Sequence, residues 1–250
     1  MEDAGLNASA PPQQRWLDGW LVRFSPGKAK RARCVNAVAI GRLPLERKLA
    51  LAGAVFEEAG LPLVVRVTRF TQPAGLDREL EDRAFSLMDD TRVMVCPRLA
   101  GPASPPPLPP GTHWARLDAQ DYAETVGALR GSPSVQRAAH AQRIAMSPVP
   151  YQGYAIRRDD DGAVLACGQF AREADLVGLY DVFTRDDQRG QGLATLLCQR
   201  LLSLAAMEGA GIGYLQVDSG NTAARRIYTR LGFADGYAYH YRLAPGASES

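Results

Sequence analysis

The feature that most constrains the fold is a strand that leads through a glycine-containing turn into an apolar helix, at residues 175–208. The segment DLVGLYDVFT is rich in β-branched and aromatic residues, which predicts a strand. After the turn, leucines recur three and four residues apart from Gly192 to about Glu208, which predicts a helix with one buried face. The first backbone N–H groups of such a helix lack internal partners and lie at the positive end of its dipole. The turn can therefore hold an anion.

Two known phosphate-binding loops share this outline, and the sequence fits neither of them. A dinucleotide-binding loop needs a third glycine or alanine at the position where Thr195 follows Gly190 and Gly192. A P-loop needs the sequence Gly-Lys-Ser/Thr, which this turn does not contain. The strands before the turn also carry the signals of antiparallel hairpins, with Asp-Asp-Asp-Gly between two of them.

The rest of the chain repeats the order strand, helix, strand, helix, strand on both sides of a proline-rich stretch. Proline fixes φ and removes a donor, so this stretch is typical of an extended linker. We expect a linker at 101–111, an N-terminal domain at 1–100 and a C-terminal domain at 112–250. The alternation predicts an α/β (α+β) fold.

A second motif, LQVDSGNTAARRIYTRLGF, follows the helix. Together with Arg189-Gly190-Gln191-Gly192-Leu193-Ala194, it resembles the signature of the GNAT superfamily of acetyl-CoA-dependent N-acetyltransferases, whose first motif is R/Q-x-x-G-x-G/A. The resemblance covers roughly residues 112 to 243. In the second motif, five residues stand at the family's spacing: Asn221, Ala224, Tyr228, Gly232 and Phe233.

The resemblance implies the GNAT fold, with a mixed central sheet flanked by helices. It also implies which residues bind acetyl-CoA, the cosubstrate. The backbone amides of the turn would hold the pyrophosphate, the exposed strand backbone would pair with the pantetheine arm and polarise the acetyl carbonyl, and Asn221 would contact the pantetheine. The residues implied are Val182, Phe183, Thr184, Arg189, Gly190, Gln191, Gly192, Leu193, Ala194, Thr195, Asn221 and Tyr228. No metal is expected.

The expected reaction transfers an acetyl group to a primary amine by direct attack, and two residues are candidates for its proton transfers. The resemblance implies that Tyr228 protonates the departing thiolate, and Asp181, or a water chain from it, is the candidate general base. Each has a plainer alternative: Tyr228 as a core aromatic residue and Asp181 as a hydrogen-bonded strand residue. Asn221 is in any case a helix cap.

The N-terminal half resembles a degenerate copy of the same architecture. When the halves are aligned, Gly41 falls opposite Gly192. The motif residues Arg189, Ala194 and Tyr228 have no match, because Val38, Leu43 and Leu80 fall opposite them. We therefore expect a tandem protein whose first half does not bind coenzyme A in the usual way. That half would line the substrate cleft or mediate dimerisation.

The composition of the chain limits the classes of partner that we expect. The net charge of +2 gives no general argument for nucleic acid binding, and the four cysteines lack CxxC spacing. The N-terminus does not resemble a signal peptide, and no apolar run approaches the ~20 residues of a membrane span. We expect a cytoplasmic enzyme with an amine acceptor (a small molecule or peptide), no nucleic acid, no membrane contact, and a homodimer as one option. The alternative function is a non-catalytic acyl-CoA-binding sensor or interaction module.

Overall fold

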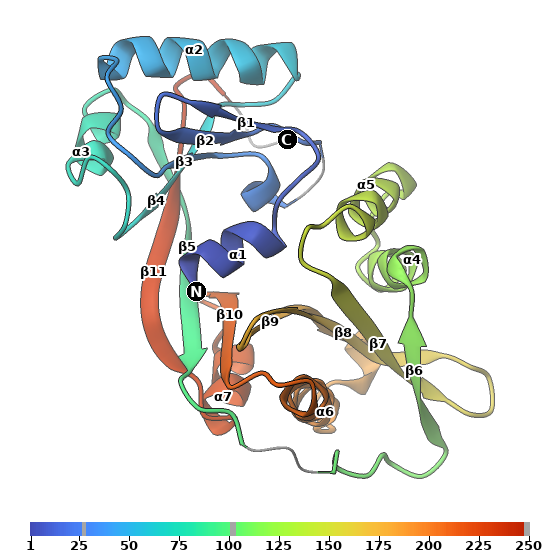
Figure 1. Cartoon of the computed structure of the whole chain (residues 1–250). Coiled ribbons are helices and arrows are strands. Elements are labelled where there is room, and N and C mark those ends of the chain that lie inside the picture. The colour runs from blue at the N-terminus through green and yellow to red at the C-terminus, as the bar shows by residue number, and fades with distance from the viewer. Residues whose placement is uncertain (27–28, 101–103, 248–250) are drawn as a thin grey trace. The chain divides into compact units, whose positions relative to one another are not determined.

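The computed structural model describes residues 1–26, 29–100 and 104–247, and Figure 1 traces the chain through its helices and strands. Contacts divide the chain into two compact units, each built from three stretches of sequence. Unit 1 comprises Met1–Ala8, Val93–Val217 and Asn221–Gly236, and unit 2 comprises Ser9–Arg92, Asp218–Gly220 and Tyr237–Ser250. In the described part of the chain, every helix is too short or too polar to cross a bilayer.

Unit 1 contains a mixed sheet, as expected for the α/β class. Its strand order is β11, β5, β10, β9, β8, β7, β6, with antiparallel pairing from β6 to β9 and parallel pairing between β9 and β10. The strands are β5 (Ser86–Cys96), β6 (Thr112–Leu117), β7 (Tyr151–Arg158), β8 (Val164–Glu173), β9 (Leu176–Thr184), β10 (Ile212–Asp218) and β11 (Ala234–Leu243).

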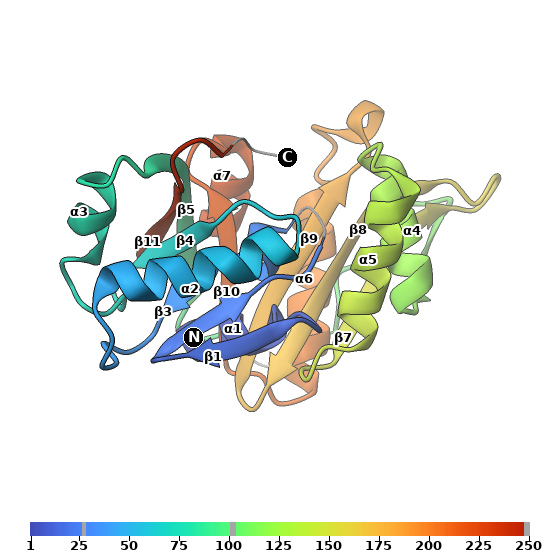
Figure 2. The same cartoon turned by 90° about the horizontal axis from the view of Figure 1, so that it is seen from above.

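The helices of unit 1 cover both faces of this sheet. Figures 1 and 2 agree that α4 and α5 lie on one face of β7–β9 and α6 on the other. On α6 the residues Leu193, Leu197 and Leu201 recur every fourth position and are all buried, which is the period that places side chains on one helix face. The helices are α1 (Glu2–Ala8), α4 (Ala119–Leu129), α5 (Ser134–Ala145), α6 (Leu193–Met207) and α7 (Thr222–Arg230).

Unit 2 has its own group of strands and its own core. The strand order is β1, β2, β3, β4, β11, and α2 joins the parallel pair β3 and β4. Trp20, Phe56 and Leu80 are buried in its core. Its elements are β1 (Gln14–Leu17), β2 (Trp20–Arg23), β3 (Val35–Ala37), α2 (Leu45–Glu58), β4 (Val64–Thr68) and α3 (Leu76–Glu81).

The compact units divide the chain differently from the expected domains at 1–100 and 112–250. Helix α1 belongs to unit 1, and β11 from Tyr237 onward belongs to unit 2 because it pairs with β4, with Tyr239 opposite Thr68. Sequence pattern alone does not reveal pairing between strands this far apart. Of the expected linker at 101–111, residues 101–103 lie outside the described residues.

Candidate active site

The site is built around the N-terminus of α6, where the chain turns out of β9 into the helix. Gly190 and Gly192 both have φ of +79°, a conformation that costs a residue with a Cβ roughly 1–2 kcal/mol. A Cβ on either residue would meet no other atom within 4 Å. The backbone conformation, and not crowding, therefore requires glycine, and the space beside the turn is open.

Strand β9 offers a second row of backbone groups. Its pairing with β10 ends at Leu179, and β9 continues to Thr184. Val182, Phe183 and Thr184 therefore have an edge toward β10 that takes no part in this pairing. Peptide groups on such an edge can bond to an extended ligand in the manner of an added strand.

A cavity of about 540 Å³ joins these two elements to α7. Every residue expected to bind acetyl-CoA lines this cavity except Gln191, whose Nε2 lies 3.5 Å from Oε1 of Gln188. The structure thus brings together residues that the sequence places on a strand, a turn and two helices. The lining residues are Val182, Phe183, Thr184, Gln188, Arg189, Gly190, Gly192, Leu193, Ala194, Thr195, Cys198, Asn221, Ala223, Ala224, Ile227, Tyr228 and Arg230.

Helix α7 supplies the far wall of the cavity. Asn221 caps it, with the side-chain oxygen accepting a bond from the Ala224 N–H at 3.1 Å, as the cap pattern predicts. Tyr228 is 9% exposed, and burial raises the pKa of its hydroxyl well above the usual value. The hydroxyl therefore stays protonated throughout the physiological range.

Arg189 lies at the exposed rim of the turn. Its Nη2 is 2.6 Å from Oδ1 of Asp186, and its side chain is 61% exposed. The guanidinium also lies 5.8 Å from the centre of the Phe183 ring. An anion entering the cavity would thus meet a guanidinium that already has a carboxylate partner.

Asp181 sits at an irregularity in β9. The register between β8 and β9 shifts between Cys167 and Gln169, and Asp181 has φ of +51°. A bulge of this kind redirects a side chain relative to a regular strand. Asp181 does not line the 540 Å³ cavity.

Three side chains surround the Asp181 carboxylate. Nη1 of Arg130 donates to Oδ1 at 2.9 Å, Nε2 of Gln169 donates to Oδ2 at 2.9 Å, and Nε2 of His140 lies 3.2 Å from Oδ2. Burial by itself would raise the pKa of Asp181, but His140, Arg130 and Arg143 outweigh burial and hold it well below the usual range. This carboxylate is a weak base, which disfavours the predicted role of Asp181 as the group that accepts a proton.

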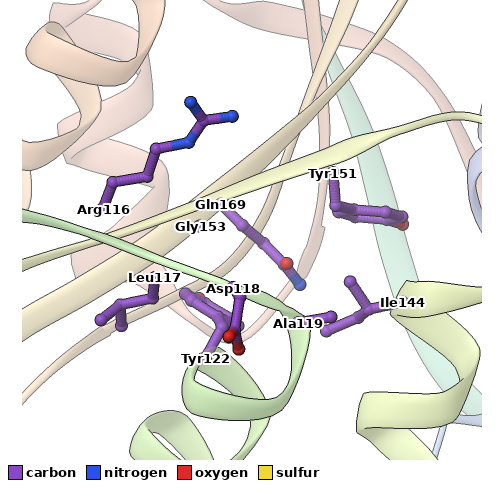
Figure 3. A pocket seen from close by; sticks show the side chains of 9 residues that line it. All are labelled: Arg116, Leu117, Asp118, Ala119, Tyr122, Ile144, Tyr151, Gly153 and Gln169. Carbon is purple, nitrogen blue, oxygen red and sulfur yellow. The ribbon is translucent and has the colours of Figure 1, made fainter.

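A second cavity, of about 410 Å³, lies between β7, β8 and the helices α4 and α5. Figure 3 shows the Gln169 amide projecting among Asp118, Ile144 and Tyr151, while the Arg116 guanidinium extends away from it. The lining residues are Arg116, Leu117, Asp118, Ala119, Tyr122, Ile144, Tyr151, Gly153 and Gln169. No group of three or more His, Cys, Asp or Glu side chains in the described residues is placed to share a metal ion.

Sequence reasoning missed two kinds of residue. Ala224 and Ile227 line the first cavity beside Tyr228, and their i, i+3, i+4 spacing on one helix face could have identified them. Gln169 and His140 are different, because only the bulge at Asp181 and the packing of α5 bring them together. Their spacing in the sequence carries no signal.

The comparisons with known proteins agree with this geometry. The family model described as "Probable histone acetyltransferase Rv0428c C-terminal" matches residues 1–242. The uncharacterized N-acetyltransferase YobR of Bacillus subtilis is 24% identical over 236 residues, which is 92% of each chain. The L-methionine sulfoximine/L-methionine sulfone acetyltransferase of Pseudomonas aeruginosa is 35% identical over 89 residues, 33% of this chain and 52% of that protein.

Among solved structures, the GCN5-related N-acetyltransferase from Kribbella flavida is similar in fold. Its TM-score is 0.67 at 19% identity, over 98% of this chain and 94% of that one. The GNAT fold predicted from the two motifs is confirmed, and so is the class of enzyme. The chain belongs to the family of the Rv0428c C-terminal acetyltransferase domain, and it is an enzyme of the N-acetyltransferase type in the GNAT superfamily.

Proposed function

We propose that this enzyme transfers an acetyl group from acetyl-CoA to a primary amine by direct attack. The single observation that carries the proposal is the cavity at the N-terminus of α6. One open space holds the glycine turn, the unpaired edge of β9, and Asn221 and Tyr228 from α7.

In this proposal the cavity binds the donor through backbone groups. The pyrophosphate would accept hydrogen bonds from the first N–H groups of α6, where the helix dipole also favours negative charge. Arg230, which lines the same cavity, adds a positive charge. The pantetheine amides would pair with the edge of β9 at Val182–Thr184, and a backbone N–H there would stabilise the oxyanion that forms on the acetyl carbonyl.

The proposed reaction needs two proton movements. The amine nitrogen attacks the acetyl carbonyl carbon, the C–S bond breaks, and the nitrogen loses one proton while the coenzyme A thiolate gains one. Tyr228 is the proposed donor toward the sulfur. Its raised pKa keeps the hydroxyl protonated and makes full proton transfer to a thiolate unfavourable. The main contribution that we assign to Tyr228 is therefore a hydrogen bond to the departing sulfur. The thiolate takes its proton from water, which balances the proton that the amine releases to water.

For the proton that leaves the amine, we propose water rather than direct transfer to Asp181. The Asp181 carboxylate already accepts hydrogen bonds from Arg130 and Gln169, and these bonds favour its charged form. We assign Asp181 a positioning role, in which it orients the side chains that contact it.

Titration calorimetry with acetyl-CoA, followed by thiol release with four amines, tests the proposal. The amines are n-butylamine, 1,4-diaminobutane, L-leucine and L-methionine sulfone, the last because the Pseudomonas relative acts on it by name. We expect sub-millimolar acetyl-CoA binding and amine-dependent thiol release. Binding without release would favour the acyl-CoA sensor, and absence of binding would exclude both functions.

A further inference from the structure

Strand β9 contains one extra residue at the point where the proposed donor contacts begin. In the pairing of β8 with β9, Gly168 stands opposite two residues, Asp181 and Val182, which is the arrangement of a β-bulge. Asp181 has φ of +51°, and a residue with a Cβ keeps such a conformation only where surrounding contacts hold it. The contacts that hold Asp181 therefore also set the direction of the peptide groups that follow it.

Arg130, which directly follows the last residue of α4, contacts both neighbours of Val182. Its Nη1 donates to Oδ1 of Asp181 at 2.9 Å, and its Cζ lies 5.6 Å from the centre of the Phe183 ring. A guanidinium can make both contacts at once, because its edge donates hydrogen bonds while its planar face lies against an aromatic ring. One side chain thus holds the residue before Val182 and the residue after it.

Helix α4 makes a second contact with the bulge. Tyr122 is 1% exposed, and its hydroxyl donates to the backbone carbonyl of Asp181 at 2.9 Å. On the other side, Nε2 of Gln169 donates to Oδ2 of the Asp181 carboxylate. The side chain and the backbone of Asp181 are therefore both fixed, and of these contacts the one from Arg130 extends to Phe183.

The influence of Arg130 on the proposed reaction is indirect. Val182 and Phe183 line the cavity proposed for acetyl-CoA, whereas Arg130 does not. The backbone at these two residues is the part of β9 proposed to pair with the pantetheine arm and to polarise the acetyl carbonyl. A reacting group that is misplaced by about 1 Å can cost about 100-fold in rate, so the contacts that fix this backbone matter for catalysis.

We propose that Arg130 is a positioning residue for acetyl transfer, which holds Asp181 and Phe183 together and thereby fixes the peptide groups at Val182 against which the thioester binds. The inference rests on the proposed acetyl transfer and adds to it a residue that acts through the backbone of β9. Stabilisation of an oxyanion depends on an N–H that already points at the developing charge. Loss of Arg130 should therefore lower the rate more than the affinity for the donor.

The first test replaces Arg130 with methionine, which keeps an unbranched side chain and removes the guanidinium. With the fastest of the four amines, Arg130→Met should lower kcat about tenfold. The affinity for acetyl-CoA should fall about fivefold, because the edge of β9 pairs less well with the pantetheine arm. The affinity for 3′-phospho-ADP, the nucleotide portion of coenzyme A, should stay within about twofold, because this probe would contact only the turn at α6.

The matched control is Arg137→Met on α5. Nε of Arg137 lies 3.3 Å from Oε2 of Glu124, so this arginine also forms an ion pair between elements, and it does not line the cavity proposed for acetyl-CoA. The control should keep the wild-type kcat and both affinities.

The second test is the conservative variant Arg130→Lys. Lysine keeps a positive charge for the Asp181 carboxylate but lacks the planar face that lies against Phe183, so kcat should fall only about threefold. If Arg130→Met does not fold, this variant decides the question by itself, and an unchanged kcat would then overturn the proposal.

The remaining outcomes separate the positioning role from the proposed function. Wild-type kcat in both Arg130 variants, with a wild type that transfers acetyl groups, would overturn the positioning role and leave the proposed function standing. Equal losses of affinity for acetyl-CoA and 3′-phospho-ADP in Arg130→Met would also overturn it, because a general disturbance of the fold gives that pattern. A wild type that binds no acetyl-CoA would instead refute the proposed function.

Discussion

The N-termini of α2 and α6 share a local architecture and differ in what occupies them. Each helix connects two parallel strands, β3 and β4 in unit 2 and β9 and β10 in unit 1. Each is preceded by a glycine in the left-handed region, Gly41 at φ +73° and Gly192 at φ +79°. At α6 the turn opens into the 540 Å³ cavity. Before α2, which begins at Leu45, the turn at Gly41 is filled by the chain itself.

The group that fills it is the Asp18 carboxylate. It accepts the backbone N–H groups of Arg42 at 2.9 Å and Leu43 at 2.8 Å, and these two bonds hold the pKa of Asp18 below its usual value. Lys48, itself buried, donates to the Asp18 carbonyl at 2.7 Å and to the carbonyl of Ile40. An internal carboxylate thus occupies two N–H groups of the turn that precedes α2, whereas the turn that precedes α6 opens into a cavity.

The difference gives a physical reason for the expectation that the first half does not bind coenzyme A in the usual way. Val38, Leu43 and Leu80 replace side chains of the signature, and Asp18 in addition occupies the backbone N–H groups of Arg42 and Leu43 in the turn that precedes α2. A helix N-terminus binds an external anion only where the protein leaves it open.

The most direct way to break the contrast is to give α6 a carboxylate of its own. Thr195→Asp places one in the first turn of α6, inside the cavity, where it would compete with the coenzyme A phosphates for the same N–H groups. We expect calorimetry to show a loss of acetyl-CoA affinity of about 100-fold, which corresponds to roughly 2.8 kcal/mol. Thr222→Asp in the first turn of α7, which does not line the cavity, is the control. Equal affinities for both variants would contradict the comparison.

Removing the Tyr228 hydroxyl tests whether the catalytic residues belong to unit 1. If the hydroxyl donates to the departing sulfur, Tyr228→Phe should lower kcat about 30-fold, because a hydrogen bond to a charged group contributes roughly 1.5–3 kcal/mol. Acetyl-CoA affinity should change less than twofold. Tyr239→Phe, at a buried tyrosine of unit 2, should keep the wild-type kcat. Unchanged turnover in Tyr228→Phe would leave that residue a packing role alone.

The two glycines should respond differently to alanine. Both substitutions incur left-handed strain of roughly 1–2 kcal/mol. At Gly41 the new Cβ would also collide with the Asp18 carbonyl, whereas at Gly192 it would meet nothing within 4 Å. In urea unfolding, Gly41→Ala should therefore lose about 1 kcal/mol more than Gly192→Ala. Equal losses would mean that Asp18 moves aside without cost.

The smallest expected effect concerns the pH dependence of Asp181. A depressed folded pKa stabilises the protein at pH values above the unfolded value of about 3.9, and that contribution is lost as the pH falls through the folded value. The stability difference between wild type and Asp181→Asn should therefore be constant from about pH 6 to 8 and shrink by roughly 1 kcal/mol toward pH 3. The pH profile of kcat near neutrality should keep its shape. If Asp181→Asn lost the increase of kcat with rising pH, Asp181 would be the general base.

Local signals in the sequence were sufficient to predict much of the secondary structure. The leucine spacing predicted α6, and the structure starts the helix at Leu193, directly after Gly192. The antiparallel hairpin predicted around Asp-Asp-Asp-Gly is present as β7, Tyr151–Arg158, and β8, Val164–Glu173. The cap at Asn221 is present with its bond to Ala224. These features depend on residues within one or two turns of each other, and a single sequence contains that information.

The contacts that shape the site join residues that are far apart in the sequence. The short helix α1 and strand β1 were not expected, since seven and four residues carry little periodicity. Gln169, His140 and Arg130 meet at Asp181 from β8, α5 and the end of α4. The β-bulge at Asp181 brings these side chains into contact, and nothing in their sequence spacing predicts these contacts. For this reason we propose a positioning role for Asp181, whose carboxylate has three polar neighbours, in place of the role of general base that the sequence suggests.

The sequence by itself determined the family and the glycine turn proposed to bind the donor, because glycine conformation, helix period and capping are local properties that a motif encodes. Only the tertiary structure decided that the turn before α2 is occupied and that the turn before α6 is open. Asp18 reaches Arg42 and Leu43 across a gap of 24 or more residues, and Gln169 reaches Asp181 across neighbouring strands. Contacts between distant segments depend on strand pairing and packing, so the occupied turn and the open turn became visible together only in three dimensions.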